Sequence, residues 1–381
     1  MSTAHAKLSA SGSAKWSLCP GSVFAEKDYP NTTSVFAEEG TAAHELAEML
    51  LRDEDDVSMM VLQDLIVGFT LPESGVVVTQ DMYDYVQSYV SYVNSISGEL
   101  FVEQRVDFSH IAPDGFGTSD AIVINDSVMT IVDLKYGKGV RVDAENNTQG
   151  ILYALGAVND YGMLFNIKTI NIVIVQPRLD HISEWTIGID ELNRWGERLK
   201  QAAELALSEN APRSPGEKQC QWCRAKATCP ALAKLTESTL MTSFDNLDTS
   251  KPEQLTDEQL KVALDNKKLI VSWFDAVETL VTDRLSTGQA FNGYKLVAGR
   301  ANRAWRDEAT VAKVLSTVLS EDTIYTRKMI SPAQAEKELG KSRAELLEDL
   351  VTKPEGAPTL VPETDKRPAV NVSKNDFDII N

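Results

Sequence analysis

The segment GFGTSDAIVINDSVMTIVDLKYGKG, residues 115–139, decides the fold of the chain's core. It contains two short apolar runs rich in β-branched side chains, 121–124 and 128–132, and the Asn-Asp-Ser sequence between them is typical of a turn. The segment therefore predicts a β-hairpin. Side-chain alternation along its two strands then determines which residues can meet.

Three charged side chains are expected to converge at one end of this hairpin. Asp133 and Lys135 share one face of the strand, and Leu134 takes the other. Pairing across the hairpin brings Asp120 towards the same end. A solvated charged face is the alternative, but the second run is almost wholly apolar before its charges begin, which is typical of a strand buried on both faces. Charges at the end of such a strand are costly unless they pair or bind a metal ion.

Length and composition place the chain among ordinary globular proteins. It has 381 residues, enough for two or more domains, with 43% hydrophobic and 24% charged residues. The formal net charge of −19 argues against a protein that coats nucleic acid through its overall field, but it leaves room for a local basic groove. The sequence has no apolar run long enough for a membrane span and no apolar N-terminal core like that of a signal peptide. We therefore expect a cytoplasmic protein without a membrane partner.

The spacing of apolar residues predicts a mixed α/β core. Residues 35–52 have the period of a helix with Gly40 and Thr41 as its expected entry, which places His44 in the first two turns. The order of elements is two helices, three strands, a helix and a strand, which predicts a sheet with helices packed against it. The further predicted helices are 79–97, 146–162 and 190–209, and the further predicted strands are 99–108 and 169–178.

We expect four regions along the chain. They are an N-terminal helical segment with Cys19 and His44 (1–98), the α/β core with the later cysteines (99–235), a mainly helical C-terminal region (250–352) and an extended or flexible tail (353–381). The tail is assigned from its prolines, which interrupt regular structure.

Three cysteines lie close together in the sequence, and the fourth lies far upstream. Cys220, Cys223 and Cys229 form a compact trio, and Cys19 is the remaining cysteine. Disulfides are not expected in a cytosolic chain. Zinc and a [4Fe–4S] cluster each take four thiolates, and the spacing leaves both open, whereas independent buried thiols explain such a trio poorly. A metal group held by all four would join the N-terminal segment to the end of the α/β core.

Four short motifs, in their order along the chain, resemble the RecB-like branch of the PD-(D/E)XK nucleases. They are Gly40-Thr41-x-x-His44-Glu45, Gly117-x-x-Asp120, Asp133-Leu134-Lys135 and Gln149-x-x-x-Tyr153. Cys19 together with the later trio resembles the iron–sulfur members of that branch, namely the CRISPR-associated RecB-like exonucleases and the AddB nuclease domain. The resemblance covers roughly residues 15–232, and the overall layout is similar to a phage-encoded RecB-like family.

The resemblance implies a restriction-endonuclease-like fold with a metal-dependent active site. The implied PD-(D/E)XK core has a mixed central sheet flanked by helices, and a mainly helical C-terminal extension follows it. Asp120, Asp133 and His44 are the implied ligands of Mg²⁺ or Mn²⁺. Lys135 would hold the attacking water or the scissile phosphate beside the metal. Without the other motifs, His44 would be interpreted as an ordinary helix histidine, and Lys135 as the partner of an acid in an ordinary ion pair.

Three further residues are candidates for the same site. Gln149 and Tyr153 are four residues apart and share one helix face, which the resemblance turns towards DNA; packing of Tyr153 against the sheet is the alternative. Glu103 lies in the preceding strand, where related nucleases often carry an acid near the metal. Glu103 and Arg105 also share a strand face, so an ion pair between them is the alternative.

The implied activity is exonucleolytic hydrolysis of DNA, in phage-type recombination or DNA processing. DNA is the implied substrate, and a single-strand annealing or single-strand-binding protein is the implied partner, in the cytoplasm of a bacterial or phage-infected host cell. A structure-specific endonuclease and a non-catalytic DNA-binding or scaffolding module are the alternatives. The resemblance favours iron–sulfur over zinc, and the cluster is interpreted as structural because hydrolysis requires no electron transfer.

Several basic residues are candidates for contacts with DNA. Lys138 and Arg141 follow the hairpin, and Arg300 and Arg303 lie near Trp305 in the C-terminal region. Arginine beside an exposed aromatic side chain suits phosphate contact and base stacking. For the C-terminal arginines, a solvated basic edge is the alternative.

Overall fold

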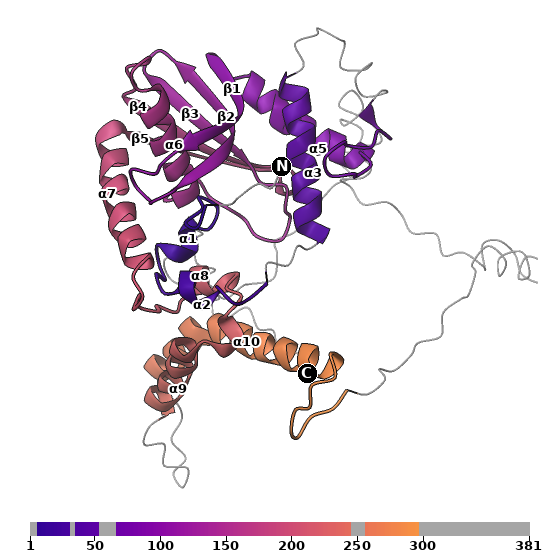
Figure 1. Cartoon of the computed structure of the whole chain (residues 1–381), viewed down its shortest axis with the longest axis vertical. Coiled ribbons are helices and arrows are strands. Elements are labelled where there is room, and N and C mark those ends of the chain that lie inside the picture. The colour runs from indigo at the N-terminus through magenta and orange to yellow at the C-terminus, as the bar shows by residue number, and fades with distance from the viewer. Residues whose placement is uncertain (1–5, 31–34, 53–65, 245–255, 297–381) are drawn as a thin grey trace, which may run out of the picture. The chain divides into compact units, whose positions relative to one another are not determined.

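The computed structural model describes residues 6–30, 35–52, 66–244 and 256–296 (Figure 1). The chain divides into residues 1–296 and 297–381, and all described residues belong to the first part. Arg300, Arg303, the tail and most of the predicted C-terminal helical region therefore lie outside the described residues. Residues 291–296, which are the described residues just before Arg300 and Arg303, contain no helix.

A five-stranded mixed sheet forms the centre of an α/β core (Figure 1). Its strands, in spatial as well as sequence order, are β1 (Glu99–Asp107), β2 (Phe116–Asn125), β3 (Val128–Leu134), β4 (Thr169–Gln176) and β5 (His181–Gly188). β3 and β4 are parallel, and the other neighbouring pairs are antiparallel. A parallel pair requires a crossover connection, which helix α6 (Thr148–Tyr161) supplies.

The predicted hairpin is present as β2 and β3. Its register pairs Asn125 with Val128, so Asp126 and Ser127 form a two-residue turn. Asp126 has a φ of 53°, the left-handed conformation that such turns favour and that aspartate tolerates. β3 is buried along nearly its whole length, as expected for a strand covered on both faces.

Helices cover both faces of the sheet (Figure 1). One face packs against α3 (Val35–Arg52) and α5 (Gln80–Asn94), and the other packs against α6 and α7 (Ile189–Ala206). Ile131 of β3 belongs to the core on the α6 side, and Leu134 belongs to the core on the α3 side. Asp133, two residues after Ile131, therefore points towards α6.

Shorter elements and a helical pair complete the described part. These are α1 (Ser13–Trp16), α2 (Ser22–Ala25), η1 (Pro177–Leu179), α8 (Glu217–Gln221), η2 (Lys226–Thr228), α9 (Pro230–Phe244) and α10 (Asp257–Ser286). α10 begins at a capping box in which Thr256 and Gln259 satisfy each other's backbone N–H groups. Among the described helices, none combines the length and apolar character needed to span a bilayer.

Two details of the sequence prediction are wrong. The last predicted strand was 169–178, so the prediction missed β5. The residues of β5 mostly alternate between partly buried and exposed, and β5 therefore lacks the continuous apolar run by which β3 and β4 were recognised. The predicted helix entry is also wrong, because α3 begins at Val35. Thr41 Oγ1 donates to the carbonyl of Ala37 one turn earlier instead of capping, which leaves His44 in the third turn.

Candidate functional site

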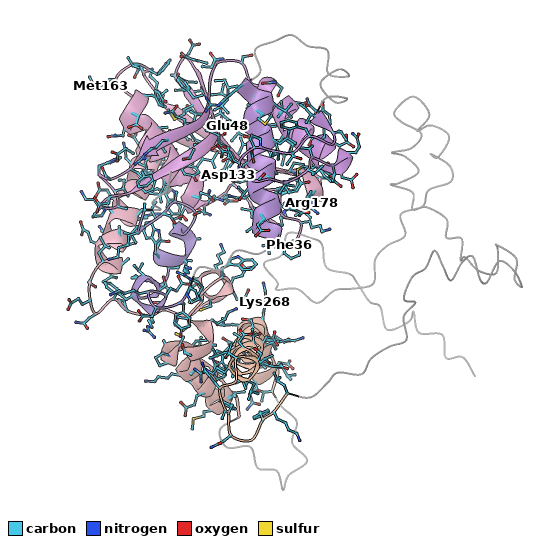
Figure 2. The ribbon with its side chains drawn as sticks, turned by 45° about the vertical axis from the view of Figure 1, so that its right-hand side comes forward. Phe36, Glu48, Asp133, Met163, Arg178 and Lys268 are labelled. Carbon is cyan, nitrogen blue, oxygen red and sulfur yellow. The ribbon has the colours of Figure 1, made fainter. Side chains whose placement is uncertain are left out.

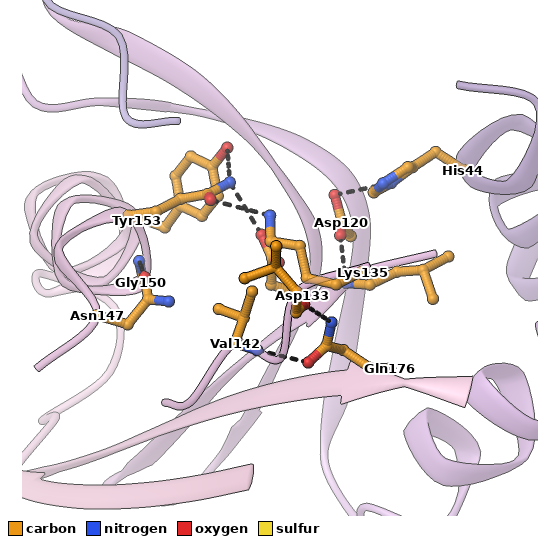
Figure 3. Close-up of polar contacts among 12 residues, drawn as sticks. His44, Asp120, Asp133, Lys135, Val142, Asn147, Gly150, Tyr153 and Gln176 are labelled. Atoms are coloured by element: carbon orange, nitrogen blue, oxygen red, sulfur yellow. Dashed lines mark hydrogen bonds and ion pairs between the residues drawn. The ribbon is translucent and has the colours of Figure 1, made fainter. Parts of the chain in front are cut away.

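A polar network at the end of β3 joins the strand to α6 (Figure 3). The ammonium of Lys135 lies 2.8 Å from Oδ2 of Asp133 and donates a 2.9 Å hydrogen bond to Oε1 of Gln149. The amide nitrogen of Gln149 donates to Oδ1 of Asp133 at 3.0 Å and to the hydroxyl of Tyr153 at 3.1 Å. Gln149 therefore connects the acid–lysine pair to the helix face predicted to look towards it.

Burial distinguishes this network from a solvated charged face. Asp133 is 2% exposed and lies inside the body formed by the sheet and helices, whereas Met163, at the rim, is 98% exposed (Figure 2). Burying a carboxylate is costly, and here a hydrogen-bonded ammonium offsets part of that cost. The wet-face alternative for the hairpin therefore fails.

Asp120 meets the same end of the hairpin from β2. Its Oδ2 accepts a 2.7 Å hydrogen bond from the backbone N–H of Leu134, and its Oδ1 lies 3.2 Å from Nδ1 of His44 (Figure 3). The expected convergence of Asp120 with Asp133 and Lys135 is thus present, and α3 adds the histidine.

The charges of these groups influence one another. Burial opposes protonation of His44, but the carboxylates of Asp120 and Asp133 together outweigh this and raise its pKa to about 9. Burial favours protonation of Asp120, yet His44 and then Lys135 hold its pKa below the ordinary value. Burial, opposed by Lys135, raises the pKa of Asp133. The negative charge of Asp120 and Asp133 therefore favours a proton on His44, and a metal cation bound at the same place would neutralise that charge instead.

Glu103 completes a compact set of metal-ligating atoms. One donor atom from each of His44, Glu103 and Asp120 lies within 4.8 Å of the other two, and this is the single such set of three among the described residues. The register of β1 and β2 places Glu103 opposite Asp120. Asp133, although adjacent, does not belong to this set, because its carboxylate is held by Lys135 and Gln149.

The backbone at Glu103 is strained. Its φ of 46° is a left-handed conformation that costs a glutamate about 1–3 kcal/mol. Phe101 and Val106 are five positions apart and pack against the same core. In a regular strand, side chains five positions apart point to opposite faces of the sheet. The side chains of β1 therefore change faces between these two residues, near Glu103. Burial, followed by Asp120, raises the pKa of Glu103 to about 7. The alternative pairing with Arg105 is not among the ion pairs of the described residues; that guanidinium lies 3.9 Å from the Phe116 ring centroid.

Gly117 explains the first part of the Gly117-x-x-Asp120 motif. A Cβ at this position would lie 2.7 Å from Cε1 of Tyr153, so any other residue displaces that ring. Tyr153 is 6% exposed and packs in the core beside α6, while its hydroxyl accepts from Gln149. The packing interpretation of Tyr153 is therefore confirmed, its hydroxyl also belongs to the polar network, and a role towards DNA stays a prediction.

The loop between β3 and α6 carries Lys138 and Arg141, both of them exposed. The buried side chain of Gln176 holds this loop: its Oε1 accepts from the Val142 N–H at 2.7 Å and its amide donates to the Val140 carbonyl at 3.0 Å (Figure 3). Arg141 pairs with Asp143 at 3.1 Å. The two predicted DNA-contacting residues thus lie on an anchored loop that starts at Lys135.

Two buried residues were missed by the sequence reasoning. Tyr89 of α5 is fully buried, its hydroxyl has no hydrogen-bond partner within the described ranges, and burial followed by the charges of Asp120, Asp133 and Glu103 raises its pKa. Gln176 is the other. Helical spacing predicts which face of α5 is buried, but no feature of the sequence predicts which groups surround the hydroxyl of Tyr89.

The N-terminal segment and the cysteine trio lie side by side. Gly21 N donates to the carbonyl of Pro212, and Ser214 N donates to Sγ of Cys19 at 3.3 Å. The backbone N–H of Arg224 donates to Glu26 at 2.7 Å, and its guanidinium donates to the Tyr29 carbonyl at 2.9 Å. The segment that carries Cys19 therefore packs against the segment that leads to the later cysteines, while a shared metal group stays a prediction.

The four thiols are free and electrostatically linked. Burial raises the pKa values of Cys19 and Cys220, and nearby thiolates add to the effect: Cys229 acts on both, and Cys19 also acts on Cys220. Burial, followed by Glu26, raises the pKa of Cys223 to about 11. No three of the four sulfurs, all of which the structure describes, lie within 4.8 Å of one another.

A family model matches residues 5–368, nearly the whole chain. The chain belongs to the DUF2800 family. That family is described as "Protein of unknown function (DUF2800)". A solved structure titled "Crystal structure of SSO0001" is similar at 16% identity and a TM-score of 0.26, over 57% of this chain and 85% of that chain. A TM-score this low supports no inference about function.

Proposed function

We propose that the chain is a RecB-like nuclease with a PD-(D/E)XK core, and that it hydrolyses the phosphodiester bonds of DNA as a metal-dependent exonuclease. The observation that carries the proposal is the meeting of His44, Glu103 and Asp120 directly beside the Asp133–Lys135 pair. All four motifs of the sequence resemblance contribute to this one place. An arbitrary set of charged residues on separate elements would not be expected to converge in this way.

The donor set fits a hard divalent cation such as Mg²⁺ or Mn²⁺. The carboxylates of Glu103 and Asp120 offer the oxygen ligands that both ions prefer, and the imidazole of His44 suits Mn²⁺ better than Mg²⁺. Asp133 is a further proposed ligand through the sequence resemblance alone, since Lys135 and Gln149 hold its carboxylate outside the three-donor set. When bound, the cation would lower the pKa of a water and polarise a phosphoryl oxygen.

The other residues hold the substrate and the water. Lys135 supplies a fixed positive charge for the scissile phosphate, and Gln149 keeps its ammonium in place before substrate arrives. Tyr153 accepts from Gln149, and its own proton has no acceptor among the described residues, so it is available to a substrate oxygen. Lys138 and Arg141, on the adjoining loop, would contact the DNA backbone.

We further propose a [4Fe–4S] cluster on Cys19, Cys220, Cys223 and Cys229, with zinc as the alternative. The four thiols act on one another electrostatically, Cys19 and Cys220 through Cys229 and Cys223 through Cys220, which fits thiols gathered around one metal group. Sulfurs bound to one zinc ion lie about 2.3 Å from it and hence at most about 4.6 Å apart. No three sulfurs of this chain are that close, so the preference for iron–sulfur over zinc rests on the sequence resemblance. Its role would be to hold the two ends of the core together.

Two other functions would use the same fold. A structure-specific endonuclease needs no DNA end, and a DNA-binding or scaffolding module needs no cleavage. The presence of both the three-donor set and the acid–lysine pair favours catalysis, since a decayed site is expected to have lost a member. An exonuclease of this kind would act with a single-strand annealing or single-strand-binding protein in phage-type recombination.

The test uses the full chain, purified anaerobically, with linear and covalently closed circular DNA of the same sequence. With Mn²⁺, the linear DNA should be degraded from its ends and the circle should stay intact, and chelation with EDTA should stop degradation. Cleavage of the circle would replace the exonuclease by an endonuclease. If the protein loaded with Mn²⁺ and the iron–sulfur cluster binds DNA but cleaves neither the linear nor the circular form, that result would establish the non-catalytic module instead.

A further inference from the structure

Trp273 of α10 has a buried hydrogen-bond donor without an acceptor. Its indole Nε1 is screened from solvent and has no hydrogen-bond partner within the described part of the chain. Leaving such a donor unpaired is destabilising, because the group has lost its hydrogen bond to water. Buried donors of this kind are rare in native proteins, so the indole needs a partner that the described residues do not supply.

The surroundings of the indole offer sulfur as the acceptor. Trp273 packs against a small cluster of buried residues, formed by Cys220, Leu232 and Leu269, together with Cys229 and Leu235. The leucine side chains have no acceptor atom. The cysteine sulfurs are therefore the side-chain acceptors of this cluster, and they become strong acceptors when ionised and metal-bound.

Other N–H groups already point at sulfurs of the same site. Ser214 N donates to Sγ of Cys19 at 3.3 Å, and Gly216 N donates to Sγ of Cys220 at 3.4 Å. No hydrogen bond to the sulfur of Cys229 occurs among those of the described residues. Because Trp273 packs against the cluster that contains Cys220, its unpaired indole N–H is a candidate to join this pattern of N–H groups directed at sulfur.

We propose that the Trp273 indole N–H donates a hydrogen bond to a sulfur of the cysteine-bound [4Fe–4S] cluster, either a thiolate of Cys220 or Cys229 or the adjacent bridging sulfide. This rests on the proposed cluster. It gives α10, which follows the cysteine trio in sequence, a direct part in the cluster's environment. Because an N–H···S bond stabilises the more negative, reduced form, Trp273 raises the reduction potential of the cluster.

The test compares wild type with Trp273→Phe, using Trp222→Phe as the matched control. Trp222 lies between Cys220 and Cys223 in the sequence but is 72% exposed, so its indole N–H has water available as a partner. Reduction midpoints are measured by EPR-monitored titration with dithionite, which supplies the electron. We expect Trp273→Phe to have a more negative midpoint and Trp222→Phe to match wild type.

A second measurement does not depend on the folding of the Trp273 variant. In reduced wild-type protein labelled with indole-¹⁵N tryptophan, pulsed EPR should detect a ¹⁵N coupling to the cluster, and Trp222→Phe should retain it. Brown protein with no such coupling, or with equal midpoints in folded Trp273→Phe and wild type, would overturn the Trp273 bond and leave the cluster standing. Colourless protein that binds zinc in place of iron would overturn both, and nuclease activity enters none of these readouts.

Discussion

The ammonium of Lys135, the residue that follows β3, lies 2.8 Å from the carboxylate of Asp133, which is buried inside that strand. Buried ion pairs contribute little net stability, because desolvation of both charges offsets their attraction. The Gln149 amide bonds to both partners and fixes their relative position. Such an arrangement is better suited to holding a charge for a reaction than to stabilising the fold.

Removal of either member of this pair should abolish DNA cleavage. Asp133→Ala removes a proposed metal ligand, and Lys135→Ala removes the charge that faces the phosphate. Both should lower the cleavage rate of linear DNA below detection while the circular dichroism spectrum and the brown colour stay unchanged. Asp126→Asn, at the turn of the same hairpin, is the matched control and should cleave normally. Normal cleavage by the Lys135 variant would remove this residue from the mechanism.

Binding of Mn²⁺ should depend on the three-donor set. We expect Asp120→Asn and His44→Ala to weaken binding by more than about tenfold, measured by the EPR signal of free Mn²⁺, because each removes a ligand atom. Glu103→Gln should weaken it as well. Asp126→Asn again serves as the control. Equal affinities in wild type and Asp120→Asn would place the cation elsewhere and count against the proposed site.

Two of the four tyrosines of α5, Tyr89 and Tyr92, should respond in opposite directions to removal of their hydroxyls. The Tyr89 hydroxyl is buried without a partner in the described residues, so Tyr89→Phe should raise the free energy of unfolding of the metal-free protein by about 1–3 kcal/mol. The Tyr92 hydroxyl donates to Glu184 at 2.6 Å, so Tyr92→Phe should lower it by about 0.5–1.5 kcal/mol. Urea titration measures both. Destabilisation by Tyr89→Phe would mean that the Tyr89 hydroxyl has a stabilising partner.

Replacement of Gln176 should loosen the loop that carries Lys138 and Arg141. Gln176→Leu leaves the N–H of Val142 and the carbonyl of Val140 unpaired, which should cost about 1–3 kcal/mol. Amide hydrogen exchange should then accelerate in the loop and stay unchanged in β2. Gln201→Leu, at an exposed position of α7, should change neither quantity. Unchanged exchange in the loop would show that the loop is held by other contacts.

The sequence by itself determined the centre of the sheet and which of its side chains can meet. Period-two alternation in 128–134 determined the facing of Asp133 and Leu134, and the turn residues 125–127 located the reversal of the hairpin, because both are local properties of the backbone. The register was not predicted, since Asn125 is the last residue of β2 and the turn has two residues. The sequence did not identify β5, whose polar edge lacks an apolar run, or the start of α3, since a mid-helix threonine resembles a cap.

Only the tertiary structure decided which distant groups lie together. In the folded chain the left-handed backbone at Glu103 accompanies a three-donor set of Glu103, His44 and Asp120. Asp133 lies outside that set and pairs with Lys135. The tertiary structure also packed the segment that carries Cys19 against the segment that leads to the later cysteines, and it enclosed the donors of Tyr89 and Trp273 without partners among the described residues. Burial and distance between remote segments depend on how helices pack on the sheet, and local spacing in a sequence contains no measure of either.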